Sequence, residues 1–416
     1  MPGGPNVPRE RGRRAQRARA WAALYCPPVI FLLAAVLACA PAPARAGLFQ
    51  RGASKAPPAA SEAPSRATAA PASVQLPGVK TTSASPLVPA ATVLPRSEAK
   101  AVVAASSPAN ENALAAAERL FDGRGGKALA ETDALAGPWS TPAQLRRLSA
   151  EPPARPDAVR FSVIGDSDPG EFWFLRLANR KGRGMFRRFL GQATKNSEFV
   201  VALGDMISRG TIRNFRGLFR MLAASGLDRP FFTVPGNHER SSPRARQVGN
   251  DMLYRRFFGP SDHFFDRAGV RFVFLDTSAR RLTRGQLDWL AKTLDAGPEI
   301  ARKIIFTHIA PDGLAPWTDF LGQKGIGSFG PGASEFMALA AEHAVDRVYF
   351  GHVHGFDVIE RDGVRYVLTG GGGSPLFALN VKDRFFHFLS VEAGRDGIRE
   401  IVHRADGSTF TLTPSR

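Results

Sequence analysis

Acidic and imidazole side chains recur in this sequence directly after short apolar runs. Gly165-Asp166 and Gly204-Asp205 each follow such a run, and Gly351-His352-Val353-His354 follows a third. Alternate residues of a strand point to the same face, so His352 and His354 can present two imidazoles to one side. Clustered in space, such oxygen and nitrogen donors suit divalent metal ions. The other polar residues in comparable positions are Asp168, Asn237, His238 and His308.

Each of these residues also has a simpler explanation when it is taken alone. An aspartate after a glycine, such as Asp166 or Asp205, often closes a turn or caps a helix. Asn237 after Pro235-Gly236 fits a turn, and His308 at the end of an apolar run fits a hydrogen-bonded core residue. The whole set is more informative, because five strand ends together offer carboxylate, amide and imidazole donors. Such a set suits two divalent metal ions (Mn²⁺, Fe²⁺ or Zn²⁺), which can clamp a phosphoryl oxygen and activate water for phosphate ester hydrolysis.

Cysteine usage excludes one class of site, and the charge distribution is only weak evidence for a nucleic-acid surface. The two cysteines, Cys26 and Cys39, both lie near the N-terminus, so the region with the donors has no disulfide and no thiolate metal ligand. Residues 1–150 hold 18 basic and 8 acidic side chains, whereas residues 151–416 hold 37 and 29. More than half of the excess positive charge therefore lies outside the region with the donors. No strip of aromatic and basic residues indicates a nucleic-acid surface.

The apolar runs predict the elements that bring the donors together. They are short, rich in Val, Ile and Phe, and separated by helical patterns such as 185–191 and 284–294, which is typical of strands flanked by helices. This order predicts an α/β fold of two packed mixed β-sheets flanked by helices, with the donors at the carboxyl ends of strands. The predicted strands are 159–164, 199–203, 231–234, 272–275, 304–306, 348–350, 356–360, 364–368, 385–391, 398–402 and 409–412.

Residues 1–46 have the pattern of an export signal. Six arginines precede an apolar stretch at 21–40, and Ala44-Arg45-Ala46 supplies the small residues of a cleavage site. We therefore expect an exported protein, periplasmic or extracellular. Two other outcomes stay open. The stretch reaches the length of a membrane anchor if Pro27-Pro28 is tolerated, and Val36-Leu37-Ala38-Cys39 loosely resembles a lipobox.

Residues 47–150 are predicted to be a flexible linker with short helices. Up to residue 107 the segment consists mainly of Ala, Pro, Ser and Thr, and its apolar residues follow neither a helical nor a strand period. This composition cannot bury enough apolar surface to offset the entropy of the chain. Short helices are expected at 110–122 and 142–148, either docked on the folded domain or formed only locally. The folded domain is expected at residues 151–416.

In their order along the chain, the motifs resemble those of the calcineurin-like metallophosphoesterases. Five motifs in that order make the resemblance specific over residues 157–375, and segments 274–278, 282–290 and 366–373 are also similar to the family. The resemblance implies that residues 151–416 are a metallophosphoesterase domain, an α/β/β/α sandwich with a binuclear metal centre. The five motifs are Asp166, Gly204-Asp205, Gly236-Asn237-His238-Glu239, His308 and Gly351-His352-Val353-His354.

By this resemblance, six residues would hold two divalent metal ions. Asp205 would bridge the two ions, and each ion would have further ligands of its own. These are Asp166 and His354 for the first ion, and Asn237, His308 and His352 for the second.

Two further residues would act on the phosphate rather than on the metals. His238 resembles the family's outer histidine, which steadies the phosphate and can protonate the leaving oxygen as a general acid. Arg209 follows Asp205 at the spacing of the phosphoprotein-phosphatase branch, where an arginine binds a phosphate oxygen. Ser208 stands where that branch usually has an aspartate, so a surface salt bridge is the alternative role for Arg209.

One position departs from the family pattern. The first motif of the family usually reads Asp-x-His, whereas this chain reads Asp166-Ser167-Asp168. Asp168 could bind the first ion through a carboxylate oxygen, which would give a harder site with more affinity for Mn²⁺ or Mg²⁺. Alternatively, Asp168 points away and the first site is weak.

The resemblance implies an exported phosphoesterase that hydrolyses phosphate monoesters or diesters through a metal-bridging hydroxide. The expected partner is a phosphorylated small molecule or another phosphoester substrate. Two alternatives stay open: a catalytically weak member of the family that binds phosphorylated ligands, and a phosphodiesterase or nuclease that acts on polyanions. No specific nucleic acid is expected as a partner.

Overall fold

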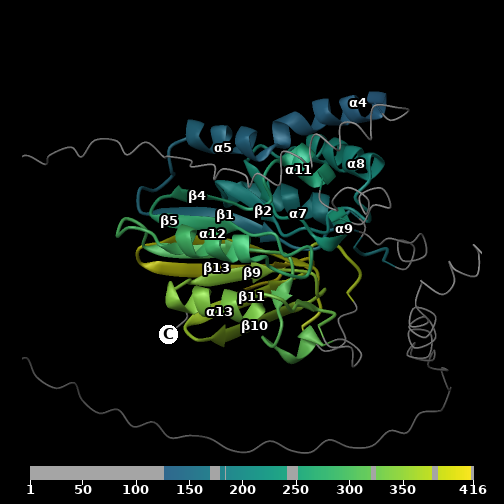
Figure 1. Cartoon of the computed structure of the whole chain (residues 1–416). Helices are drawn as coiled ribbons and strands as arrows, with labels where there is room; N and C mark the ends of the chain where they lie inside the picture. The colour runs from purple at the N-terminus through teal and green to yellow at the C-terminus, as the bar shows by residue number, and fades with distance from the viewer. Residues whose placement is uncertain are drawn as a thin grey trace, which may run out of the picture. The chain divides into compact units, whose positions relative to one another are not determined.

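The apolar runs of the sequence form two six-stranded β-sheets (Figure 1). The computed structural model describes residues 126–168, 179–182, 184–240, 252–319, 325–376 and 383–413. Sheet A has the strand order β14-β13-β12-β1-β2-β3, and sheet B has the order β10-β11-β9-β6-β5-β4. The strands of sheet A are β1 (Ala158–Ile164), β2 (Phe199–Ala202), β3 (Phe231–Thr233), β12 (His387–Gly394), β13 (Gly397–Arg404) and β14 (Thr409–Thr411). Those of sheet B are β4 (His263–Arg267), β5 (Val270–Phe274), β6 (Arg302–Phe306), β9 (Arg347–Phe350), β10 (Phe356–Arg361) and β11 (Val364–Thr369).

Parallel strands form the centre of sheet B and one side of sheet A, and antiparallel strands complete each sheet. In sheet A, β1, β2 and β3 are parallel, and β12 runs antiparallel to β1. In sheet B, β5, β6, β9 and β11 are parallel, whereas β4 and β10 are antiparallel to their neighbours. Every predicted strand is present with its ends shifted by a few residues, while β4 and a short parallel pair, β7 (Ala310–Pro311) and β8 (Ser328–Phe329), were not predicted.

The core between the sheets is rich in aromatic rings. Phe161 of β1 stacks on Phe199 of β2, and its edge meets Phe272 of β5, with ring centroids 5.3 Å apart in both pairs. Central strands that are covered on both faces need apolar side chains in both directions. This explains why the sequence shows continuous apolar runs here rather than alternation.

Helices cover the outer face of each sheet. A buried cluster joins the outer face of sheet A to α4 (Gly126–Ala136), α7 (Met185–Ala193), α8 (Ile212–Ala223) and α11 (Met252–Phe258). A second cluster joins sheet B to α12 (Arg284–Leu294) and α13 (Ala333–Glu342). The result is the predicted α/β/β/α sandwich. Short 3₁₀ helices lie at Gly137–Trp139, Thr194–Asn196 and Pro316–Thr318.

The helix predicted at 142–148 is α5 (Thr141–Ala150), and it docks on the domain. The side chain of Gln144 accepts a hydrogen bond from the backbone N–H of Phe231 at 2.8 Å, which ties α5 to β3. Leu145 and Leu148 pack into the core between the sheets. The packed unit therefore includes residues N-terminal to 151.

Residues 1–125 lie outside the described residues, and with them the predicted export signal, anchor, lipobox and the helix at 110–122. Among the helices that the structure describes, none combines the length and the apolar character needed to cross a membrane.

Candidate metal centre

Three residues at the carboxyl ends of strands adopt a left-handed backbone. Asp166 (φ 50°) follows β1, Asp205 (φ 47°) follows β2, and His352 (φ 67°) follows β9. This conformation is costly for residues other than glycine, and it persists where the surrounding structure enforces it, often at functional sites. All three residues are predicted metal ligands, and they lie at the ends of strands where α/β folds place ligands.

Glycines beside these residues allow the backbone to approach the carboxylates closely. A Cβ atom on Gly236 would lie 2.1 Å from Oδ1 of Asp205, and one on Gly351 would lie 2.0 Å from Oδ2 of Asp166. Any side chain at these positions would displace a carboxylate. The glycines of the motifs are therefore required by the packing of the site.

Glu239 fixes the loop that carries Asp205. The Oε2 atom of Glu239 accepts hydrogen bonds from the backbone N–H groups of Asp205 (2.8 Å) and Gly236 (2.7 Å). Its Oε1 atom accepts from Met206 (2.8 Å) and Ile207 (3.2 Å). Burial raises the pKa of Glu239 to about 7. The motif contained Glu239, but sequence analysis gave it no role.

Each of three imidazoles has one nitrogen on a backbone carbonyl. The Nδ1–H of His308 donates to the carbonyl of Leu203 (2.6 Å), and His354 contacts another carbonyl through Nδ1 (2.7 Å). His352 is turned the other way, with Nε2 3.2 Å from the carbonyl of Ile326. Metal-binding histidines commonly donate one N–H in this way, which fixes the ring and leaves the other nitrogen for the metal.

The second nitrogen of His308 faces carboxylate and amide oxygens. Its Nε2 atom lies 3.3 Å from Oδ2 of Asp205 and 3.3 Å from Oδ1 of Asn237. Asp205, His308 and His352 each offer a ligand atom within 4.8 Å of the other two. The structure thus brings together the bridging carboxylate and the three residues predicted for the second ion.

The two residues predicted for the first ion also meet. The Nε2 atom of His354 lies 3.6 Å from Oδ1 of Asp166. Both carboxylate oxygens of Asp166 accept the backbone N–H of His352, at 3.0 and 2.8 Å. This contact links the loop after β1 to the loop after β9. It therefore joins a residue predicted for the first ion to one predicted for the second.

Asp168 lies beside this cluster rather than pointing away from it. Its Oδ2 atom is 3.8 Å from Nδ1 of His238, and Nε2 of His238 is 3.9 Å from Oδ2 of Asp205. The His238 side chain is 32% exposed, whereas that of Asp168 is 5% exposed. His238 therefore stands at the mouth of the site between two buried carboxylates.

The donor set fits divalent metal ions. Among the described residues, Oδ2 of Asp168 and Nδ1 of His352 are buried without a hydrogen-bond partner. Buried polar atoms are nearly always paired, so two such atoms in one site indicate that a ligand completes them. Carboxylate oxygens and imidazole nitrogens are the donors that Mn²⁺, Fe²⁺ and Zn²⁺ accept.

Burial and neighbouring charges of the protein itself shift the pKa values of the acidic and imidazole side chains in the site. Asp205 raises the pKa of His238 to about 10. Burial disfavours the charged form of His308, yet Asp205 raises the pKa of His308 to about 9. Burial would raise the pKa of Asp205, but His238 and His308 hold it well below its usual range. Burial lowers the pKa of His352. The site thus concentrates negative charge that cations stabilise.

One arginine contacts the centre, and two others lie close in sequence to its predicted residues. Arg209 is half-buried in the loop after Asp205, where its carbonyl accepts the N–H of Thr211 at 2.8 Å. Arg240, at the end of α9 (Asn237–Arg240), contacts Oδ2 of Asp276 at 3.5 Å. Arg280 lies 2.9 Å from Nε2 of His352. Arg240 and Arg280 were missed, because their partners come from segments distant in sequence; the role of Arg209 stays a prediction.

Solved structures of related folds resemble this chain at low identity. Purple acid phosphatase PPD1 from yellow lupin seeds has 18% identity and a TM-score of 0.47 over 63% of this chain and 55% of the lupin chain. GAP50, the anchor in the inner membrane complex of Plasmodium, has 16% identity and a TM-score of 0.44 over 62% of this chain and 90% of its own. The match thus spans about half of the lupin protein.

None of the curated proteins compared with this chain matches its sequence. The family model of the calcineurin-like phosphoesterases matches residues 159–356, a range that contains every residue of the site described above. Residues 159–356 of this chain are therefore a calcineurin-like phosphoesterase domain.

Proposed function

We propose that the chain is a metal-dependent phosphoesterase that hydrolyses phosphate monoesters or diesters. One observation carries the proposal: Asp205, His308 and His352 converge to within 4.8 Å at the strand ends of a calcineurin-like phosphoesterase domain. Beside them, His354 and Asp166 form a second pair at 3.6 Å. Two divalent ions bound there would supply Lewis-acid polarisation of the phosphoryl group and activation of the attacking water.

The protein residues hold this site in a fixed geometry. Asp205 is proposed to bridge the two halves; its Oδ2 faces His308, and its Oδ1 accepts the backbone N–H of His238 at 2.9 Å, which holds the carboxylate in place. One half consists of Asn237, His308 and His352. The other half consists of Asp166 and His354. Asp168 is proposed to add a carboxylate to this second half, at the position where the family usually has a histidine.

His238 is the proposed general acid. It is the partly exposed member of the cluster, and the carboxylates of Asp205 and Asp168 both favour its protonated form. A protonated imidazole at the mouth of the site can donate its proton to the leaving alkoxide as the ester bond breaks. Arg209 is proposed to bind a phosphoryl oxygen, since a guanidinium matches the geometry of a phosphate.

The substrate and location complete the proposal. We propose a phosphorylated small molecule or similar phosphoester as the partner, and export to the periplasm or the outside of the cell, with or without anchoring at the N-terminus. The support for export is the arginine-rich, apolar and small-residue order of residues 1–46.

The test is a hydrolysis assay of the full-length chain after reloading with Mn²⁺, with a chromogenic phosphate monoester and the matching diester measured in parallel. We expect turnover that a chelator removes and Mn²⁺ restores, and a loss of about 100-fold in kcat for His238→Gln. Wild-type turnover that survives complete chelation would reject the proposal. The preferred ester distinguishes a phosphatase from a phosphodiesterase.

One observation favours a second candidate, a binding protein with weak or no catalysis. The chain has Asp168 where the family usually has the histidine of its first motif. A protein that binds two Mn²⁺ ions and inorganic phosphate but hydrolyses neither ester would support this candidate. Hydrolysis of either ester would exclude it.

A further inference from the structure

Arg280 is held rigidly beside the metal centre. It lies between β5 and α12 with a left-handed backbone (φ 57°). One side of its guanidinium, Nη1, donates to the carbonyls of Ile326 (2.5 Å) and Ser328 (3.3 Å), with a longer contact to Gly325 (3.4 Å). Three carbonyls from one segment therefore fix the plane of the guanidinium and leave its other side facing His352.

On the other side of the guanidinium, Nε has no acceptor among the described residues, and the one neighbour of Nη2 is His352. Nη2 lies 2.9 Å from Nε2 of His352. That nitrogen has the carbonyl of Ile326 as an acceptor for its own proton, which is the arrangement that leaves Nδ1 of His352 for a metal. With a metal ion on Nδ1, Nε2 of His352 would keep its own proton, and Nη2 of Arg280 would lose the imidazole as an acceptor. Among the described residues, neither Nη2 nor Nε of Arg280 reaches an oxygen acceptor.

Arg280 also lacks a carboxylate partner. Two other arginines of the domain have one: Arg302 lies 2.9 Å from Asp346, and Arg267 contacts Glu198. No acidic group in the part of the chain that the structure describes lies within ion-pair distance of Arg280. Its nearest electrostatic attraction comes from Asp205, and burial lowers its pKa. A half-buried cation of this kind requires an anion nearby.

Metal binding strengthens this requirement. Asp205, the acidic group that attracts Arg280, is also the proposed bridging ligand, so two divalent ions would take over its charge. The two divalent ions and Arg280 would then carry more positive charge than the carboxylates of Asp166, Asp168 and Asp205 can neutralise. A guanidinium donates two parallel N–H bonds, which match two oxygens of one phosphoryl group.

We propose that Arg280 binds a phosphoryl oxygen of the substrate, on the sheet B side of the metal centre. The inference rests on the proposed phosphoesterase function and adds a specificity residue to it. Arg209 lies on the loop after β2 of sheet A, and Arg280 lies after β5 of sheet B, so the two arginines approach the centre from different sheets. Two arginines favour a doubly charged phosphoryl group, which is the form found in a monoester.

The test is the affinity of the Mn²⁺-loaded full-length chain for inorganic phosphate, measured by calorimetry for wild type, Arg280→Gln, Arg280→Lys and Arg281→Gln. Arg281 is the exposed neighbour and the matched control. We expect phosphate to bind about tenfold more weakly to Arg280→Gln, a smaller loss for Arg280→Lys, which keeps the charge, and no change for Arg281→Gln. The Kd for Mn²⁺ should change by less than about twofold in all variants.

Two results would overturn the inference. Phosphate affinity of Arg280→Gln equal to that of wild type shows that no phosphoryl oxygen is bound there. Weaker Mn²⁺ binding by Arg280→Gln with phosphate affinity unchanged at saturating Mn²⁺ makes Arg280 a positioning residue for His352. If wild type binds phosphate through Arg280 but hydrolyses neither ester, the proposed function fails and this inference stands. If wild type hydrolyses esters and Arg280→Gln keeps its KM and phosphate affinity, only this inference fails.

Discussion

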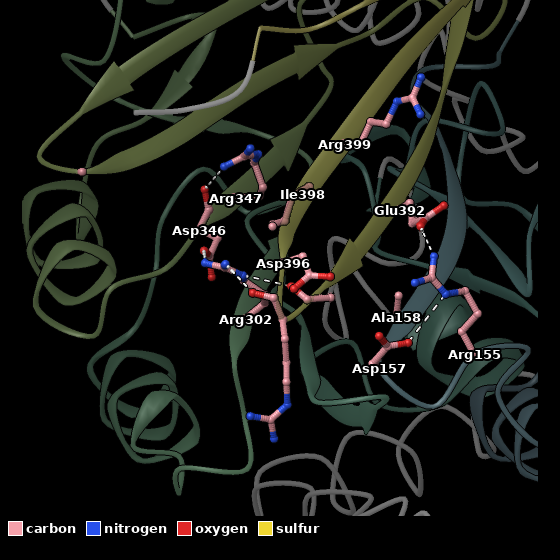
Figure 2. A pocket seen from close by; sticks show the side chains of 14 residues that line it. Arg155, Asp157, Ala158, Arg302, Asp346, Arg347, Glu392, Asp396, Ile398 and Arg399 are labelled. Atoms are coloured by element: carbon pink, nitrogen blue, oxygen red, sulfur yellow. Dashed lines mark hydrogen bonds and ion pairs between the residues drawn. The ribbon is translucent and has the colours of Figure 1, made fainter. Parts of the chain in front are cut away.

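The two ends of the parallel strands both carry charged side chains, but they use them differently. At the amino ends lies a cavity of about 600 Å³ lined by basic and acidic residues (Figure 2). There Arg302 pairs with Asp346 at 2.9 Å, and Arg155 pairs with Glu392 at 2.8 Å. At the carboxyl ends, in contrast, Asp168 and His352 have buried atoms without hydrogen-bond partners among the described residues.

The deepest charges at the amino ends form a closed network. Glu400 of β13, which is 1% exposed, accepts hydrogen bonds from Arg347 (3.0 Å), Tyr349 (2.6 Å) and Arg365 (3.4 Å) of sheet B. This network joins the two sheets and satisfies its own members. The comparison of the two ends of the strands shows that buried charge alone does not identify a functional site. Buried atoms without partners also occur elsewhere in the described part of the chain, as in His263 and Arg404, so a site is indicated where such atoms lie together with further ligating side chains.

The largest expected effect is at the carboxyl ends. Asp205→Asn removes the charge that faces His308 and His238, and it should lower kcat by about 10³-fold or more, because bridged metal ions supply several kcal/mol of stabilisation to the transition state. Mn²⁺ titration should show weaker binding. The matched control is Asp396→Asn at the exposed rim of the cavity at the amino ends, with activity unchanged. Wild-type turnover by Asp205→Asn would reject the site assignment.

At the amino ends a comparable substitution should affect stability instead. Glu400→Gln leaves Arg347 buried without its carboxylate, whereas Arg365 keeps Glu360, and breaking such a buried pair costs about 3–5 kcal/mol of the free energy of unfolding. Denaturant unfolding measures this loss, and kcat per folded molecule should stay at the wild-type level. A reduced kcat with unchanged stability would mean that the two ends are coupled.

Sequence alone predicted the elements whose signals are local. The ends of α12 match the helical pattern at 284–294, because Thr283 and Gln286 form a capping box at its start. The central strands were found because they are apolar on both faces. Helix α8 was missed, although Phe215, Leu218, Phe219 and Leu222 form a buried stripe at helical spacing.

Among the site residues, those in motifs could be predicted and those defined by tertiary contacts could not. Asp205 and His308 follow apolar runs, so their location at strand ends could be inferred. Arg280 follows no such pattern. Its importance depends on the carbonyls at 325–328 and on His352, which reach it only after sheet B has formed. Asp168 could be assigned to the site only once its distance to His238 was known.

The charged groups at the two ends should contribute differently to the pH dependence of the protein's stability. In the metal-free protein, the pKa of His308 is raised to about 9 and that of His238 to about 10. Groups with a raised pKa in the folded state stabilise it fully below their unfolded pKa, near 6.5, and this stabilisation is lost as pH rises through the folded pKa. Because each pKa unit corresponds to about 1.4 kcal/mol, we expect a loss of several kcal/mol in the free energy of unfolding between pH 7 and pH 10.

Denaturant unfolding at both pH values, in a chelator, measures this loss. His308→Asn should reduce the pH dependence, because it removes one of the two titrating histidines and leaves His238. Glu400→Gln should be less stable throughout but keep the wild-type slope, since arginine stays charged over this range. A slope that His308→Asn leaves unchanged would place the titrating group elsewhere in the chain.

The smallest effect is expected from an exposed ion pair at the amino ends. Arg155 and Glu392 lie 2.8 Å apart, but their side chains are 47% and 39% exposed. Because water and salt screen such a pair, Arg155→Ala should change the free energy of unfolding by no more than about 0.5 kcal/mol and leave kcat/KM unchanged. Unfolding curves and the ester assay measure both quantities. A loss above about 1 kcal/mol would show that the ion pairs that line the cavity in Figure 2 contribute more to stability than the exposure of their side chains indicates. The contrast between the two ends would then rest on the metal centre alone.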